Sequence, residues 1–190
     1  MMYLMALMIC LSVLYSGDGK IYSVDLKRST LKWTGTKVTG SHWGYVTMKE
    51  GSVTLEEKKV VSGEFTVDMK IITNEDMDDS RWKAKLLTHL RSDDFFDVTN
   101  YPTASFCLKS SLFQQGKFRV KGDLTIRGIT QPVEFLAVIQ FSDEGPRATG
   151  QIKIDRTLYN MKYKSGKFFP EIGDKMIYDE FTVDFDIVTK

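Results

Sequence analysis

The chain has 190 residues, of which 42% are hydrophobic, so it is long enough for one domain with a sizeable core and too short for two. Its 26 basic and 25 acidic residues are interleaved and leave a formal net charge of +1, which argues against a surface that binds nucleic acid by neutralising phosphates. Aromatic residues make up 12% of the chain, a content that suits a core or a cavity walled by rings.

The first segment, residues 1–16, is almost wholly apolar and gives way to polar residues from Gly17 onward. Its apolar run of about 13 residues is shorter than the roughly 20 that span a bilayer, so it predicts a signal peptide, residues 1–19, and no stable transmembrane anchor. Cys10 raises the alternative of a lipoprotein, but the residues before it are large where a small one is expected. We therefore expect a periplasmic or secreted protein, with residues 20–190 as its folded domain.

From Ile21 onward, apolar and polar residues alternate with a period of two, which is typical of antiparallel strands that have one buried face. The first runs of this kind cover residues 31–38, 45–55 and 65–71. Each run predicts a strand with a dry side and a wet side. In the third run, the dry side carries Phe65, Val67, Met69 and Ile71.

A glycine-flanked bend, residues 40–44, separates the first two runs and carries His42 beside Trp43. One interpretation is functional: His42 and Lys37 contact the head group of a ligand, and Trp43 covers its chain. The other interpretation is structural: His42 caps the turn, the glycines provide backbone freedom, and Trp33 and Trp43 belong to the core. The residues favour the structural interpretation for His42 and leave Trp43 open between the two.

One segment, from Asn74 to Arg91, departs from the alternation and predicts a single amphipathic helix inserted between strands. Basic residues lie on one side of this helix. On the other side, apolar residues recur at helical spacing: Trp82, Leu86, Leu87 and Leu90. The candidate N-caps are Asp78, Asp79 and Ser80.

The helix is followed by an acidic turn with two adjacent rings, Phe95 and Phe96. The two rings cannot both point the same way, so we expect one to face the interior of the domain and the other to face the helix. The three aspartates of the turn could form an acid/base pair, but an acidic turn after a helix is usually a solvated loop. They are Asp93, Asp94 and Asp97.

Alternation resumes after the turn and continues to the end of the chain, in runs at residues 103–113, 118–126, 133–141, 148–154 and 181–187. Turn signals such as Arg127-Gly128 separate them. The whole pattern predicts about eight strands and one helix, an all-β fold that is either a sandwich or a closed barrel. An eight-stranded barrel is just wide enough to be filled by side chains or to hold one small ligand.

The sequence carries little that predicts catalysis. The only histidines, His42 and His89, lie in different elements and have no metal-ligand spacing. No GxSxG elbow, P-loop or GxGxxG motif is present. We therefore predict no enzymatic activity, no metal site and no cofactor.

Several segments, taken together and in order along the chain, resemble the YceI family. They span almost all of the chain after the predicted signal peptide, which makes the resemblance specific. The segments are Trp33–Gly44, residues 87–106 with their Ser92-Asp93-Asp94-Phe95-Phe96-Asp97 core, residues 120–130, Ile154-Asp155-Arg156, and Ile172-Gly173-Asp174 with the closing strand.

The resemblance implies an exported, lipocalin-like, eight-stranded antiparallel β-barrel that encloses a long apolar ligand, such as a polyisoprenoid, an isoprenoid quinone or a fatty-acid-like lipid. It also makes a homodimer a reasonable expectation. Polar contacts at the mouth are expected to decide affinity, with Arg127 and Arg156 as candidates that could equally tie turns together. The predicted cavity or mouth residues are Trp33, Lys37, His42, Trp43, Phe65, Val67, Phe95, Phe96, Phe106, Phe135, Phe141, Tyr159 and Phe185.

Two alternatives stay open. The first is an envelope stress or interaction protein whose barrel is filled by side chains and binds no lipid. The second is an enzyme of isoprenoid or quinone metabolism, which would need titratable groups that converge inside the barrel. A cavity lined by residues such as Phe65, Phe135, Phe141 and Phe185 would favour carriage over a filled barrel.

Overall fold

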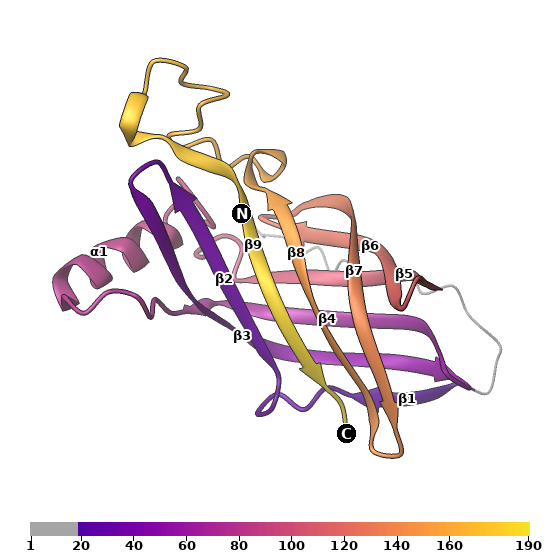
Figure 1. The fold of residues 1–190 in the computed structure, drawn as a ribbon. Helices are drawn as coiled ribbons and strands as arrows, with labels where there is room; N and C mark the ends of the chain where they lie inside the picture. The colour runs from indigo at the N-terminus through magenta and orange to yellow at the C-terminus, as the bar shows by residue number, and fades with distance from the viewer. Residues whose placement is uncertain (1–18) are drawn as a thin grey trace, which may run out of the picture.

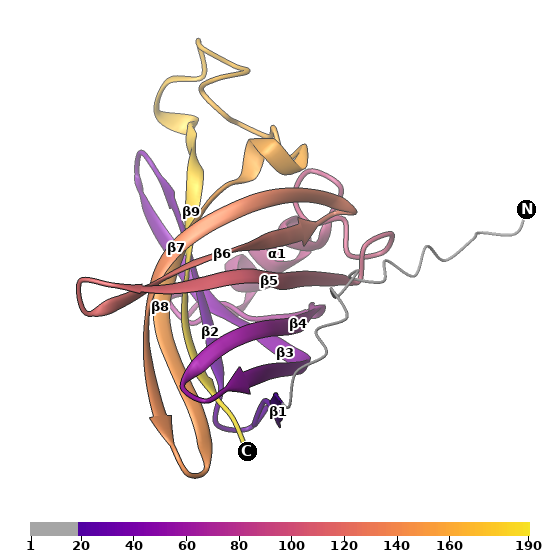
Figure 2. The same ribbon diagram turned by 90° about the vertical axis from the view of Figure 1, so that its right-hand side faces the viewer.

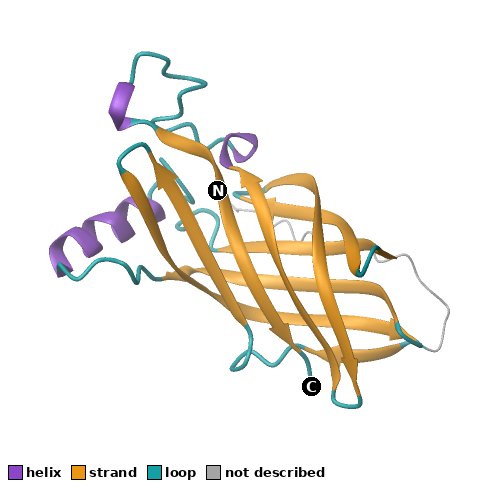
Figure 3. Cartoon of the chain, in the orientation of Figure 1, coloured by secondary structure: helices purple, strands orange, loops and turns teal. Residues whose placement is uncertain are grey.

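The computed structural model describes residues 19–190, so the predicted signal peptide up to residue 18, together with Cys10, lies outside the described residues. The described part contains nine strands, one α-helix and two short 3₁₀ helices (Figures 1 and 3). In chain order these are β1 Lys20–Ser23, β2 Thr30–Lys37, β3 Gly40–Glu56, β4 Lys59–Ile72, α1 Ser80–Arg91, β5 Thr103–Gln114, β6 Lys117–Ile126, β7 Ile129–Ser142, β8 Gly145–Asp155, η1 Arg156–Tyr159, η2 Gly173–Lys175 and β9 Ile177–Val188.

Eight of these strands close into an antiparallel barrel, as predicted (Figure 2). Around the ring the order is β3, β2, β9, β8, β7, β6, β5 and β4, and β3 pairs with β4 to complete the circle. Residues 40–46 of the long strand β3 pair with β2. Residues 52–55 of β3 pair with the short strand β1, which lies on the same side of β3 as β2. The alternation did not predict β1, which has only four residues.

Inward-facing positions follow the predicted alternation closely in β6 and β9. In β9, the residues that face the interior are Phe181, Val183, Phe185 and Ile187. The prediction is wrong at the end of β4, where Ile71 is 50% exposed and Ile72 is 3% exposed. The pairing of β4 with β3 shifts its register between Val46 and Thr47, so Ile72 replaces Ile71 on the inner face.

The helix α1 begins at Ser80, later than predicted, with the carboxylate of Asp79 accepting from the N–H groups of Arg81 and Trp82 as its N-cap. Residues 74–79 are not helical because the backbone N–H of Glu75 and the side-chain amide of Asn74 both donate to the carbonyl of Trp43. Trp82 was predicted on the buried side but is 56% exposed.

The interior holds three apolar clusters. The helix-end cluster lies where α1 meets the barrel, the hairpin-end cluster lies towards the β3–β4 hairpin, and the seam cluster lies between β1, β2, β3 and β9. Their buried members are, in the helix-end cluster, Trp33, Met69, Ile72, Leu90, Phe95, Val98, Ala104, Leu124, Ile126, Ile154, Tyr159 and Met161; in the hairpin-end cluster, Val53, Leu55, Val60, Leu108, Val120 and Ala137; and in the seam cluster, Val24, Leu31, Met48 and Ile187.

Gly44 allows the segment after β4 to cross directly over β3. A Cβ on Gly44 would collide with the backbone carbonyl of Thr73 and lie 2.9 Å from the Cα of Asn74. We expect Gly44→Ala to lower the free energy of unfolding by about 3 kcal/mol, because backbone atoms must move to admit the methyl group. Urea denaturation measures this change.

Gly35→Ala is the matched control, since its added Cβ would meet nothing closer than an atom of Trp33 at 3.9 Å. If both variants unfolded at the same urea concentration, the close approach of residues 73–74 would not be what requires glycine at position 44.

Candidate functional site

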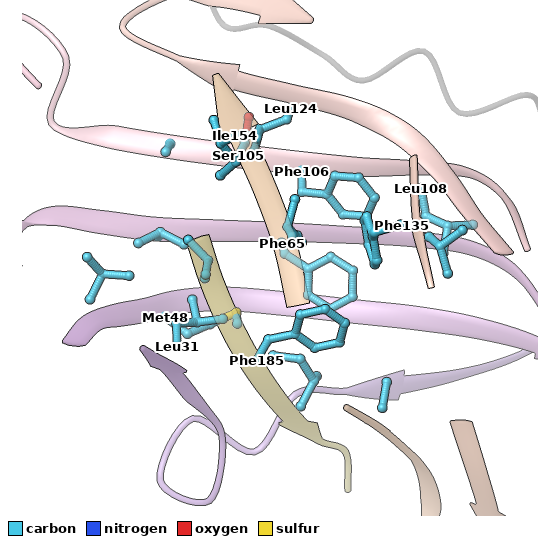
Figure 4. Close-up of a pocket in the computed structure, with 18 of the residues that line it drawn as sticks. Leu31, Met48, Phe65, Ser105, Phe106, Leu108, Leu124, Phe135, Ile154 and Phe185 are labelled. Atoms are coloured by element: carbon cyan, nitrogen blue, oxygen red, sulfur yellow. The ribbon is translucent and has the colours of Figure 1, made fainter. Parts of the chain in front are cut away.

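The barrel encloses an apolar cavity of about 190 Å³. All eight barrel strands and the turn after α1 contribute side chains to its wall (Figure 4). None of the lining residues is charged, and the only hydroxyl groups come from Ser105 and Thr189. The hydroxyl of Thr189 already donates to the carbonyl of Pro146. The wall can therefore bind an apolar chain by contact but has almost nothing polar to offer it.

The predicted site residues divide into two groups. The first group lines the cavity and consists of Trp33, Phe65, Val67, Phe96, Phe106, Phe135 and Phe185. The second group lies off the wall and consists of Lys37, His42, Trp43, Phe95, Phe141 and Tyr159.

The prediction of a bend at residues 40–44 is wrong, because these residues form the start of strand β3 and the turn from β2 lies at residues 38–39. Neither His42 nor Trp43 lines the cavity. Nδ1 of His42 lies 2.8 Å from Oδ2 of Asp76, and the backbone N–H of Trp43 donates to the same carboxylate. The indole of Trp43 lies on the outer face of β3 beneath the ammonium group of Lys32, 4.4 Å from the ring centroid. Lys37 ends β2, where its backbone pairs with Gly40. His42 thus contacts Asp76 and does not cap the turn, and Trp43 is neither core nor cavity wall.

The two rings of the turn after α1 divide as predicted. Phe96 lines the cavity and meets the ring of Phe181 edge-on, with centroids 6.1 Å apart. Phe95 packs against His89 of α1, with centroids 5.0 Å apart, and against Tyr163. This turn therefore seals the helix end of the cavity with one ring and holds the helix in place with the other.

Arg156 secures the segment that follows β8. Arg156 is 3% exposed, and its guanidinium group donates to the carbonyls of Met161 at 2.7 Å, Ile177 at 2.9 Å and Tyr178 at 3.1 Å. Burial lowers the pKa of this guanidinium, and the charges of Asp179 and Asp155 act in the opposite direction. Its donors are committed to the protein, so the structural role is confirmed.

Arg127 and Tyr159 also serve the packing of this end. Arg127 donates to the carbonyl of Asn160. Tyr159 is fully buried in the helix-end cluster, its hydroxyl has no hydrogen-bond partner, and burial raises its pKa to about 12. Phe141 lies in the hairpin-end region, where its ring contacts that of Phe118 at 6.0 Å.

Sequence reasoning missed most of the small and aliphatic wall residues. The signal that would have found them is the register: a residue lines the cavity when it shares the inner face with a lining ring, as Leu31 does opposite Phe185. Examples of missed wall residues are Leu31, Met48, Val53, Leu108, Val120, Leu124, Ala137 and Ile154.

The sequence as a whole matches the model of the YceI-like domain over residues 22–189. The chain belongs to this family. A UPF0312 protein of Photorhabdus laumondii is 32% identical over 125 residues, which is 60% of this chain and 62% of that protein, so the match spans less than two thirds of the relative's length. Protein YceI of Shigella flexneri is 29% identical over 143 residues, covering 70% of this chain and 71% of that protein.

Solved structures share the YceI-like barrel. BcnA of Burkholderia cenocepacia superposes with a TM-score of 0.68 at 20% identity, covering 86% of this chain and 98% of that chain. A domain of Saccharophagus degradans, described as a polyisoprenoid-binding domain, superposes with a TM-score of 0.67 at 15% identity, covering 89% of this chain and 97% of that chain. At these identities, the likeness establishes the fold.

Residues 19–190 lack two further features. No cluster of three or more histidine, cysteine, aspartate or glutamate side chains in this range could hold a metal ion. No helix in the same range has the length and apolar character to cross a membrane.

Asp76 makes the stability of the fold depend on pH in the acid range. Burial alone would raise its pKa, but hydrogen bonds from the Trp43 N–H, His42 and Asn74 outweigh burial and hold the pKa below its ordinary value of 3.8. Because the folded pKa lies below the unfolded one, the carboxylate stabilises the fold above about pH 3.8 and loses this effect as the pH falls through the lowered pKa.

We expect Asp76→Asn to be less stable than the unmodified protein by about 1–2 kcal/mol at neutral pH, with the difference shrinking as the pH falls below the unfolded pKa. Urea denaturation at a series of pH values measures it. A difference that stays constant across the series would show that the charge of Asp76 does not contribute.

Proposed function

We propose that this YceI-like protein binds one long apolar molecule inside its barrel, without catalysis, after export to the periplasm or the exterior. The ligand would be a polyisoprenoid, an isoprenoid quinone or a fatty-acid-like lipid. The observation that carries this proposal is the cavity inside the barrel, with its uncharged, apolar wall. The description of the Saccharophagus degradans domain, which shares the fold, supports it.

The wall chemistry argues for carriage over catalysis. Acid/base or nucleophilic catalysis needs titratable groups beside the reacting atoms. Both histidines lie outside the cavity, where His42 contacts Asp76 and His89 contacts Asp94, each at 2.8 Å. The cavity can therefore shield a chain from water but has no group positioned to transform it.

The apolar character of the wall also sets the expected affinity for the ligand. At about 0.3 kcal/mol per heavy atom, a chain of about twenty carbons would gain about 6 kcal/mol, equivalent to a dissociation constant of roughly tens of micromolar. Three of the basic candidates for a head-group contact, His42, Arg127 and Arg156, are engaged in protein contacts, and the fourth, Lys37, does not line the cavity. Apolar contact thus carries the affinity.

The volume of the cavity supports a second candidate function. An engineered protein cavity of about 150 Å³ holds one benzene molecule. The 190 Å³ in this barrel therefore accommodates only a short part of a long chain unless interior side chains change rotamer. An interaction protein with a filled barrel and no lipid ligand is the alternative that this volume supports.

The contents of the purified protein distinguish a lipid carrier from a filled-barrel interaction protein. We expect an organic extract of the protein purified from its native host to contain a long-chain lipid or isoprenoid by mass spectrometry. We also expect the purified protein to bind a fluorescent lipid probe. A protein that is empty and fails to bind the probe would be the filled-barrel interaction protein.

A pair of variants on β9 tests whether the probe binds inside. Val183 lines the cavity and its neighbour Thr182 points outward. We expect Val183→Trp to weaken probe binding at least about tenfold by filling the cavity, and Thr182→Trp to leave it unchanged. Thermal unfolding confirms that both variants fold, and equal affinities in folded variants would place the probe elsewhere.

A further inference from the structure

Four phenylalanines form a continuous chain of ring contacts inside the barrel, and we call them the phenylalanine belt. They come from four different strands: Phe65 from β4, Phe106 from β5, Phe135 from β7 and Phe185 from β9. Neighbouring ring centroids lie 6.1 Å, 5.6 Å and 5.5 Å apart in that order. Figure 4 shows the four rings grouped within the cavity.

Glycines make room for three of these rings. Gly51 lies opposite Phe65 in the pairing of β3 with β4, and a Cβ there would lie 2.8 Å from Cγ2 of Val24 and 3.0 Å from Cδ1 of the Phe65 ring. Gly150 lies opposite Phe185, and its Cβ would lie 2.7 Å from Cζ of that ring. A Cβ on Gly122 of β6 would collide with the ring of Phe106.

These glycines are not needed for an unusual backbone. None of the three has a positive φ, so any residue could adopt their conformation. A side chain is excluded by the space that the ring occupies together with a second group, which is Val24 at Gly51, the carbonyl of Cys107 at Gly122 and the carbonyl of Leu136 at Gly150. From β9 to β5, strands that supply a ring alternate with β8 and β6, which supply a glycine, while β4 supplies a ring next to β5 and has the glycine of β3 on its other side. Phe65, Phe106 and Phe185 are thus confined against the wall.

The belt lies where the three apolar clusters of the interior meet. Phe106 packs against both the helix-end and the hairpin-end clusters, and Phe65 and Phe185 pack against both the hairpin-end and the seam clusters. An apolar chain that extends from the helix end to the hairpin end must therefore pass the four rings.

We propose that the phenylalanine belt is a length gauge, which sets how many carbons of a linear apolar chain the barrel accepts. This inference rests on the proposed function. The cavity left beside the rings is about 190 Å³, so each further part of a chain must take space now held by a ring. A phenylalanine side chain has only two rotatable bonds, and glycine contacts restrict three of the four rings, which makes the limit a sharp one.

The test uses the full folded domain and a series of linear prenols that differ by one isoprene unit, measured by displacement of a fluorescent lipid probe. Phe135→Leu and Phe185→Leu keep the wall apolar while removing part of each ring. We expect both variants to move the preferred prenol at least one unit longer and to raise the affinity for the longest prenols by about tenfold.

A glycine variant tests the opposite direction. Gly63 lies on β4 two residues before Phe65, and an added Cβ would lie 3.1 Å from Cε2 of that ring and 3.3 Å from Cγ1 of Val53. Both contacts are with side chains, so Gly63→Ala should fold while pressing the ring of Phe65 towards the cavity. We expect it to shift the preference to shorter prenols, whereas the control Gly35→Ala should not.

The outcomes distinguish a failure of the proposed function from a failure of the length gauge. If the unmodified protein binds no prenol of any length and no fluorescent lipid, the proposed function fails. If it binds prenols but the folded leucine variants and Gly63→Ala keep its length preference, the function stands and the gauge is wrong. Thermal unfolding of every variant establishes which ones are folded and enter the comparison.

Discussion

The pairing of β3 with both β2 and β4 closes the sheet on itself, and the rest of the structure depends on this closure. Once the ring is complete, the ladder hydrogen bonds of its strands are satisfied between neighbours, so only side chains face the interior. Alternation then sends every second residue inward. At the start of β3, Asp76 holds His42 and the backbone of Trp43 beyond the cavity wall.

The enclosed interior balances large and small residues. Rings that meet across β4, β5, β7 and β9 occupy space that glycines on β3, β6 and β8 leave free. The same closure requires a cover at one end, which α1, the Phe95–Phe96 turn and the segment anchored by Arg156 supply. Polar groups at that end stabilise the cover, and the cavity wall remains apolar. The polar residues of the cover therefore serve stability, and the apolar residues of the wall serve the proposed carriage.

The sequence predicted what depends on local periodicity. Strands β6 and β9 and the opposite directions of Phe95 and Phe96 follow from spacing along the chain, and the sequence narrows the N-cap of α1 to three candidates that include Asp79. What depends on contacts between distant segments could not be predicted. The exchange of Ile71 for Ile72 comes from a register shift against β3, and the late start of α1 comes from hydrogen bonds to Trp43. The ring that fills each glycine's space is likewise visible only once the strands are paired.

The connection of the barrel's first and last strands also governs how the chain can fold. β2 pairs with β9, and beside this ladder Ser29 and Val188, 159 positions apart, exchange two hydrogen bonds. Contacts between such distant residues are slow to form because a long loop must close first. The barrel cannot close until residues 177–188 are available, so a growing chain exposes its apolar inner faces until the last strand is made.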